Sequence, residues 1–326
     1  MIRVNWDLPT EFSDEVTCVS WTLARLLRFY GITDPWLVFG TTLDFRLDRA
    51  TQEPLWWPPG WAGPAERLWG LTFREHDVPD FDQGWEQVVE RLAQGHPTVM
   101  VVNVFWLPYS HYYRQGQLGH CVTVIGYDQE AREATVVDAG PRRYLGPVAL
   151  DDLRRAADLE GLPRGATPFR YFEVLPPRQP LRLDASRVAL ILEAGLKGLE
   201  GEGEPPGVAA GSAGVREYAL ALDALVERLG RDRDRGRAEF IGHHTACFFW
   251  GEQRMWYSRF LEEAGRLLGD PRFEAPARVC RELFAEWRVL SALFIKPPPG
   301  TPPPWPRGCA AAWGPSPTWR SRSRPC

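Results

Sequence analysis

The sequence predicts an α+β fold for residues 1–180, followed by an all-α region over residues 181–295. In the first part, helical patterns precede a series of short apolar strand patterns, an order typical of a helix packed on a mostly antiparallel sheet. In the second part, the apolar residues recur with the period of a helix. With 326 residues, 44% of them hydrophobic, the chain can form one large domain or two of ordinary size.

The first helix is predicted in SDEVTCVSWTLARLLRFYG, which runs from Ser13 to Gly31. Its leucines and Tyr30 recur at helical spacing, and glycine is favoured just past a helix end. Thr17 and Ser13 are both suitable N-caps. If Thr17 is the cap, Cys18 lies in the first turn of a long helix.

The rest of the first part is predicted to form strands and short helices. Residues 40–79, rich in Trp, Pro and Gly, are expected to be irregular apart from a short strand near LTFRE. The later elements, in order, are a helix in DQGWEQVVERLAQG, a buried strand in PTVMVVNVF, a hairpin in LGHCVTVIGYDQEAREATVVDAG, a helix near LDDLRRAA and a strand in FRYFEVLPP.

Beyond residue 180, the predicted helices lie in ASRVALILEAGLKGLE, VREYALALDALVERLG, MWYSRFLEEAGRLLG and ARVCRELFAEWRVLSALF, with a linker in GEGEPPGVAAG. Residues 296–326 contain ten prolines and no apolar periodicity. Such a segment cannot bury enough apolar surface to offset the entropy of folding, so we expect a disordered tail.

The charge pattern restricts the class of partner. The net charge is −4 and the basic residues are scattered, which indicates neither nucleic-acid binding nor attachment to an anionic membrane. A small molecule or a protein is the expected partner. The N-terminus lacks an apolar segment of signal-peptide length, and no stretch approaches the roughly 18 consecutive apolar residues of a membrane span. We therefore expect a cytoplasmic protein.

The cysteines do not have the spacing of a metal site. They form no CxxC pair and no His/Cys cluster with zinc-ligand spacing. In the reducing cytoplasm we interpret them as free thiols, and no metal or other cofactor is expected. Their positions are 18, 121, 247, 280, 309 and 326.

Cys18 is the candidate nucleophile. A cysteine attacks as the thiolate, and a free thiol with a pKa of about 8.5 needs help to ionise at neutral pH. The unpaired N–H groups and the dipole at a helix N-terminus favour negative charge, and Cys18 has this position if Thr17 is the cap. A histidine must then accept the proton, and a carboxylate or amide must orient the imidazole.

His120 and Asp138 are the candidate base and orienting group. In a hairpin that turns around residues 129–132, the start of the first strand faces the end of the second. The two side chains are therefore expected to be cross-strand or diagonal neighbours. With Cys18 on a helix packed against this sheet, they would form a Cys-His-Asp triad.

Each of these residues also has an ordinary explanation. A lone cysteine in an amphipathic helix is usually a small buried hydrophobe. A histidine before a strand is commonly a surface residue, and an aspartate followed by Ala-Gly often begins a turn. The order Cys, His, Asp, with the helix before the hairpin, favours the triad, and we carry it forward as a hypothesis.

The loop segment LPYSHYY supplies candidate substrate-binding residues, namely Tyr109, His111 and Tyr112. These polar aromatic side chains precede His120 and would line a substrate pocket. The alternative is that they only anchor the loop.

The remaining cysteines and histidines are interpreted as structural. Strand alternation turns the side chain of Cys121 away from that of the preceding histidine, which predicts a core position. His243 and His244 are adjacent, so on a helix they do not share a face as metal ligands would. Cys247 and Cys280 lie in helical patterns and are expected to pack in the core.

Several segments together resemble the N-terminal domain of butirosin biosynthesis protein H and its relatives. They are CVSWTLARLLRFYG, VFG, VVNVFWLPYSHYY, GHCVTVIGYD and TVVDAG, and the resemblance covers roughly residues 14–175. The most specific pieces are the LPY segment and the strand H-x-V-x-V-x-G-Y-D. The later segment RMWYSRFLEEAGRLL is similar to the domain often joined to this one.

The resemblance implies a papain-like fold adapted to acyl transfer. The founding member of the family moves an aminoacyl group from an acyl carrier protein thioester to an amine of an aminoglycoside antibiotic. Carried over to this chain, Cys18 takes the acyl group as a thioester, His120 acts as general base and then acid, and Asp138 orients His120. The implied partners are an acyl carrier protein and a small-molecule amine.

The chain departs from papain-like peptidases in one respect. They generally carry a glutamine a few residues before the cysteine as an oxyanion donor, whereas this chain has Glu11, Phe12 and Ser13. A carboxylate repels an oxyanion, so the backbone N–H of Cys18, with Ser13 or another group, would have to serve. This gap disfavours peptidase activity more than acyl transfer from an activated thioester.

Two alternatives to the acyltransferase stay open. One is a cysteine peptidase or amidase that uses the same triad. The other is a catalytically inactive module that binds a peptide or a carrier protein in the cleft. Because carrier proteins are generally acidic, arginines near Cys18 would favour transfer, and the candidates are Arg25, Arg28, Arg142 and Arg143.

Overall fold

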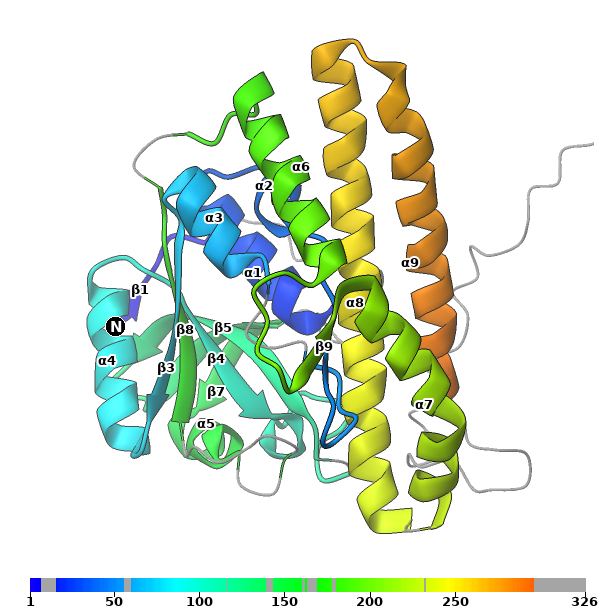
Figure 1. Ribbon diagram of the computed structural model, residues 1–326. Helices are drawn as coiled ribbons and strands as arrows, with labels where there is room; N and C mark the ends of the chain where they lie inside the picture. Colours follow the sequence, from blue (N-terminus) through cyan, green and yellow to red (C-terminus); the bar gives the residue numbers. More distant parts are fainter. Residues whose placement is uncertain are drawn as a thin grey trace, which may run out of the picture.

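A seven-stranded antiparallel sheet forms the centre of the N-terminal part of the chain (Figure 1). The strand order is β3-β8-β4-β5-β6-β7, and β1 pairs with β5. The strands are β1 (Ile2–Arg3), β3 (Thr72–Val78), β4 (Thr98–Asn103), β5 (Gly119–Asp128), β6 (Glu133–Asp138), β7 (Tyr144–Ala149) and β8 (Phe169–Leu175). This computed structural model describes residues 1–6, 16–55, 60–115, 117–138, 143–159, 162, 169–177, 180–231 and 233–295.

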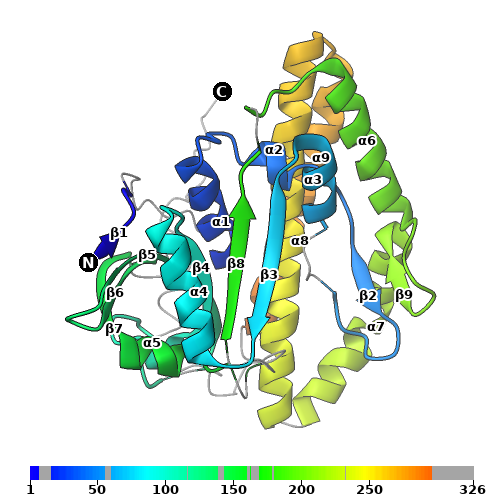
Figure 2. The ribbon, with the colours of Figure 1, turned by 90° about the vertical axis from the view of Figure 1, so that its left-hand side faces the viewer.

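Helices lie on both sides of this sheet. Figures 1 and 2 show α1 (Cys18–Phe29) on one side of the sheet and α4 (Phe81–Ala93) on the other. A shorter helix, α5 (Leu150–Ala157), packs against β4 and β7. The predicted α+β arrangement, a helix on an antiparallel sheet, is therefore confirmed.

Helix α1 begins directly after Thr17, one of the two N-caps that the sequence offered. Thr17 has an extended backbone, and its side chain accepts a hydrogen bond from the backbone N–H of Ser20 at 3.2 Å. The leucines of α1 are buried in the core, so burial of this apolar face holds the helix on the sheet. Beyond the helix, Gly31 has a φ of +83°, a conformation that glycine adopts without strain.

The hairpin of β5 and β6 has the expected turn at residues 129–132. Thr123 pairs with Val137, and a bulge follows between Val124 and Gly126. At the bulge, a side chain on Gly126 would place its Cβ 2.9 Å from the carbonyl oxygen of Ile2, so glycine allows β1 to approach. The register places Asp138 at the end of β6 that lies nearest the start of β5.

The region after residue 180 is helical, as predicted. It contains α6 (Ala185–Glu200), α7 (Gly211–Arg231), α8 (Arg233–Leu268) and α9 (Glu274–Ile295). Helix α8 has 36 residues and is about 54 Å long. It packs alongside α9 (Figure 1).

The aromatic side chains of α8 join the core of the N-terminal part. The ring of Trp250 lies 5.3 Å from that of Phe45, and the ring of Trp256 lies 5.5 Å from that of Phe39. Both tryptophans are buried. Residues 1–180 and 181–295 thus share one hydrophobic core, and the domain boundary near residue 180 stays a prediction.

The segment from residue 40 to 79 is more regular than expected. It contains β2 (Arg46–Asp48) and α3 (Ala62–Trp69), and a short helix, α2 (Trp36–Phe39), precedes it. Helix α3 tolerates its proline because Pro64 lies in the first turn, where its missing N–H has no intrahelical partner to lose. The prediction of irregular structure was therefore wrong here.

Strands β1, β7 and β9 and a short helix were also missed. Strand β7 is the edge of the sheet, where Pro147 can be accommodated. A three-residue strand, β9 (Val208–Ala210), lies in the predicted linker and pairs with β2. Strand β4 ends at Asn103, earlier than predicted, because the 3-10 helix Val104–Trp106 follows. The expected disordered tail lies outside the described residues.

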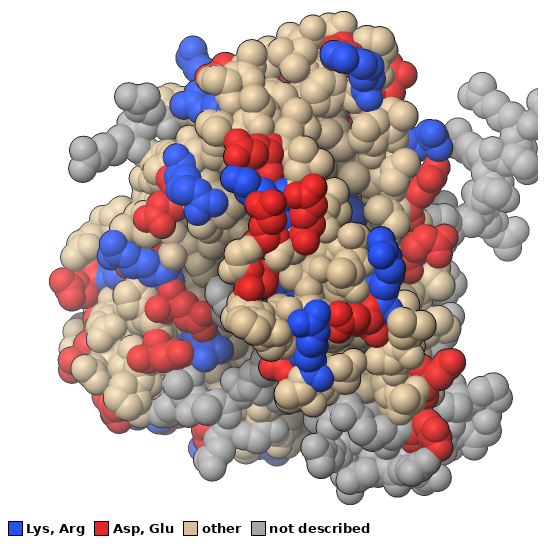
Figure 3. Space-filling model, in the orientation of Figure 1, with Lys and Arg blue, Asp and Glu red and all other residues tan. Residues whose placement is uncertain are grey.

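Two further features of the fold are the charged surface and the hydropathy of the helices. On the face shown in Figure 3, acidic and basic side chains are interspersed. Among the described residues, no helix is both long and apolar enough to cross a membrane.

Candidate active site

Cys18 is the first residue of α1, directly after the N-cap Thr17. Its side chain is partly exposed, whereas those of Cys121, Cys247 and Cys280 are buried. A thiolate at this position is favoured by the unpaired backbone N–H groups of the first turn. Position and exposure therefore both suit a nucleophile.

His120 and Asp138 are buried and directly hydrogen-bonded. Nε2 of His120 lies 2.7 Å from Oδ1 of Asp138. Because Thr123 pairs with Val137, the two residues are diagonal neighbours across the β5–β6 ladder, as the hairpin register predicts. The other ring nitrogen, Nδ1, is thus left for Cys18, with which His120 also forms a side-chain hydrogen bond.

Interactions within the site shift the pKa values of the Cys18 thiol and the His120 imidazole. Burial opposes protonation of His120, but the negative charges of Asp138 and Cys18 outweigh it and raise the pKa of the imidazole well above its usual value. The pKa of Cys18 is lowered well below its usual value, first by a hydrogen bond from the Cys121 side chain and then, against the effect of burial, by the charge of His120. The arrangement thus favours a thiolate–imidazolium pair.

Cys121 is part of this site, contrary to the prediction. It is buried, as expected, but its thiol and its backbone N–H both interact with the sulfur of Cys18. Among the described residues, β6 pairs with β5 only from Thr123 onward, and α1 packs against β5. Thr22 of α1 donates a 3.4 Å hydrogen bond to the carbonyl of Cys121 at the same place. Strand alternation alone could not show this approach.

The three residues of the LPYSHYY loop lie in different surroundings. The buried hydroxyl of Tyr109 faces Asp138, and burial together with that negative charge raises the pKa of Tyr109 well above its usual value. The Tyr109 ring stacks on Tyr144 with centroids 3.8 Å apart. Tyr112 is buried in the core, whereas His111 is exposed. Of the three, Tyr109 is thus the one that contacts the candidate triad.

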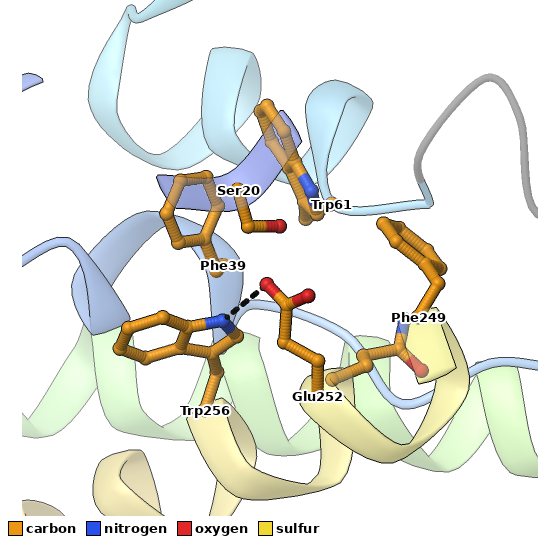
Figure 4. A pocket seen from close by; sticks show the side chains of 7 residues that line it. Ser20, Phe39, Trp61, Phe249, Glu252 and Trp256 are labelled. Carbon is orange, nitrogen blue, oxygen red and sulfur yellow. Dashed lines mark hydrogen bonds between the residues drawn. The ribbon is translucent and has the colours of Figure 1, made fainter. Parts of the chain in front are cut away.

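Glu252 of α8 reaches the start of α1, which the sequence did not suggest. Its Oε2 accepts a 2.8 Å hydrogen bond from the backbone N–H of Thr17, and its Oε1 accepts a 3.0 Å bond from Nε1 of Trp256. Figure 4 shows the Glu252 carboxylate beside the hydroxyl of Ser20, with aromatic rings around both. The small cavity between these side chains has room for about one water molecule.

Two of the arginines considered for carrier docking, Arg25 and Arg28, do not lie at an entrance to Cys18. Arg25 is buried and lies over the ring of Trp21, so it is not available to a partner, and the proposal was wrong for this residue. Arg28 is exposed but near the far end of α1, roughly 15 Å from Cys18 along the helix axis. Arg143 is exposed as well.

Some sequence predictions lie outside the described residues. These are Arg142 and the segment Glu11, Phe12 and Ser13, which was considered for the oxyanion hole.

The remaining histidines and cysteines have structural contacts. Nδ1 of His243 lies 3.0 Å from the hydroxyl of Tyr218, and His244 bonds to Ser291. Cys247 and Cys280 are buried, as predicted. Within the described parts of the chain, no group of three or more His, Cys, Asp or Glu side chains is arranged to hold a metal ion.

Comparison with known proteins agrees with the resemblance. Residues 17–139 match the family model described as butirosin biosynthesis protein H, N-terminal. The matched segment contains Cys18, His120 and Asp138. A search of curated proteins gives no match. Residues 17–139 of this chain are therefore similar in sequence to the N-terminal domain of butirosin biosynthesis protein H.

Proposed function

We propose that the protein is a cysteine-dependent acyltransferase that moves an acyl or aminoacyl group from an acyl carrier protein thioester to an amine. The observation that carries this proposal is the buried His120–Asp138 pair next to Cys18, the partly exposed first residue of α1. The family supports the biological setting, because its description refers to the biosynthesis of an antibiotic. The acceptor is then an amine of an aminoglycoside-like compound.

In the first half-reaction, the Cys18 thiolate attacks the carbonyl carbon of the donor thioester. The bond from that carbon to the carrier sulfur breaks, and the acyl group is left on Cys18 as a new thioester. The departing carrier thiolate takes the proton from Nδ1 of His120, so His120 becomes neutral. Asp138 stays bonded to Nε2 and holds the ring in this tautomer.

In the second half-reaction, the amine attacks the acyl-Cys18 carbonyl. Neutral His120 accepts the proton that the amine loses, and the Cys18 thiolate leaves as the amide bond forms. The thiolate–imidazolium pair is thereby restored for another cycle. The backbone N–H groups at the start of α1 are the donors nearest to the developing oxyanion, and a thioester needs less help from them than an amide would.

The proposal is tested by intact-mass analysis of the full chain. The probes are acetyl and glycyl thioesters of N-acetylcysteamine and of a phosphopantetheine-bearing carrier protein, followed by kanamycin as a test amine. We expect one acyl adduct that Cys18→Ala cannot form and that Cys247→Ala, a buried-cysteine control, still forms. Transfer of the acyl group to the amine supports the acyltransferase. Equal acylation of Cys18→Ala overturns it, and release of the acyl group only to water indicates a hydrolase.

A further inference from the structure

Glu252 occupies a position that is costly for a carboxylate. Its side chain is 1% exposed, and burial raises the pKa of Glu252 to about 7, even though Ser20, Thr17 and Trp256 donate hydrogen bonds to it. An apolar side chain would fill the same space without this penalty. The carboxylate oxygens bond instead to the first turn of α1 and to Trp256 of the same helix as Glu252.

The bonds of Glu252 match a known way of capping a helix. In a capping box, the N-cap side chain accepts the N–H of the third helical residue, and a Glu or Gln at that third position accepts the N–H of the N-cap residue. Thr17 and Ser20 make the first of these bonds here. The third helical residue, however, is Ser20, whose side chain is too short for the second bond. Glu252 makes that bond from a position 235 residues away in the sequence.

The capping hydrogen bonds involve residues on both sides of Cys18 in the sequence. Cys18 lies between Thr17, whose N–H is held by Glu252, and Ser20, whose N–H is held by Thr17 and whose hydroxyl also bonds to Glu252. The conformation of this turn decides where the Cys18 sulfur lies relative to His120 and Cys121. It also decides whether the free N–H groups of the turn point toward the sulfur.

We propose that Glu252 is a positioning residue that completes the cap of α1 from α8 and thereby fixes the Cys18 thiolate in its place. The catalytic meaning of this position rests on the proposed function of Cys18. The cap itself is a property of the folded chain, and it can be measured without an acyl donor. The helices after residue 180 would then contribute directly to the active site.

The experiment compares the rate at which iodoacetamide alkylates Cys18 across pH, followed by peptide mass analysis of the full chain. Glu252→Ala is expected to raise the apparent pKa of Cys18 and to slow alkylation at pH 6.5 about fivefold, the typical effect of a lost cap. Phe249→Leu changes the same cavity without removing either capping hydrogen bond and should leave the rate unchanged. Ser20→Glu combined with Glu252→Ala restores a carboxylate within α1 and should return the rate to within about twofold of the original.

The possible outcomes separate capping from a simple charge effect. At pH 8, where Glu252 is largely ionised, a role through its negative charge alone would mean that its removal stabilises the thiolate and speeds alkylation, and such an increase overturns the proposal. The proposal is also overturned if Glu252→Ala slows alkylation no more than Phe249→Leu does. It is overturned as well if the double variant is still alkylated slowly. If Glu252→Ala does not fold, a folded double variant with normal alkylation supports the cap, and an unfolded one refutes it. None of these results depends on whether Cys18 can accept an acyl group from a donor.

Discussion

The Nε2 atom of His120 lies 2.7 Å from Oδ1 of Asp138, and both residues are buried at the open end of the β5–β6 hairpin. This bond joins a titratable ring to a negative charge and leaves Nδ1 for the thiol of Cys18. The charge of Asp138 therefore determines how readily the imidazolium forms beside the nucleophile.

Replacing Asp138 with asparagine tests this dependence. The amide can still orient the ring but no longer stabilises its positive charge, so we expect the pKa of His120 to fall and acylation of Cys18 at pH 7 to slow by at least about tenfold. The pKa of His120 can be followed by NMR of its ring protons. Asp151→Asn, an exposed substitution in α5, is the matched control. An unchanged rate in Asp138→Asn would show that the charge is not needed.

The reactivity of Cys18 should persist at mildly acidic pH. Because the pKa of Cys18 is lowered and that of His120 is raised, the thiolate–imidazolium pair should exist from below neutrality until His120 loses its proton above it. A free cysteine is only about 0.3% thiolate at pH 6. We expect iodoacetamide to alkylate Cys18 at pH 6 at least about tenfold faster than it alkylates a model peptide, and His120→Ala to reduce the difference. Equal rates for protein and peptide would contradict the ion pair.

The role of the Cys121 thiol can be tested with two variants, one that keeps a hydrogen-bond donor at this position and one that does not. A hydrogen bond from its thiol is the largest single cause of the low pKa of Cys18. Cys121→Ala removes the donor and should slow alkylation of Cys18 at pH 6 several-fold, whereas Cys121→Ser keeps a donor and should slow it less. If serine and alanine behave alike, the hydrogen bond has no role in ionising Cys18.

Glu252 should make the stability of the fold depend on pH. Burial raises its pKa from about 4.5 to about 7, so between these values the folded chain holds a proton that the unfolded chain has lost. The contribution of Glu252 to the free energy of unfolding is therefore largest below about pH 4.5 and decreases by about 3 kcal/mol as the pH rises to 7.

Glu252→Gln removes this titration while keeping the shape of the side chain. Urea unfolding at pH 5 and pH 8 should show a smaller loss of stability in the variant than in the original chain. Glu263→Gln, in the same helix and in a polar setting, serves as the control. A difference between the two pH values that is the same in both chains would rule out Glu252 as its source.

The sequence was sufficient for the parts of the site that depend on local patterns. The cap at Thr17 and the hairpin turn each rest on neighbouring residues, and from them follow the position of Cys18 and the diagonal pairing of His120 with Asp138. Helix caps and cross-strand pairs depend on short sequence motifs, so they can be predicted from the sequence.

The contacts that the sequence did not reveal are those between distant segments. Nothing in the surroundings of Glu252 in the sequence indicates that α8 passes the start of α1. The interaction of Cys121 with Cys18 depends on where β6 stops pairing with β5, which alternation within one strand does not specify. Helix α3 was missed because Pro64 was taken as a sign of irregular structure, although it lies in the first turn.

The separation of Thr17 and Glu252 along the chain has a consequence for how the protein is made. Synthesis proceeds from the N-terminus, and early segments begin to fold before later ones emerge from the ribosome. Thr17 emerges 235 residues before Glu252, whose carboxylate accepts the hydrogen bond from its backbone N–H. If Glu252 completes the cap, an unfinished chain would hold Cys18 in an incompletely capped, less ionised turn, and full reactivity would arise only once α8 has been made.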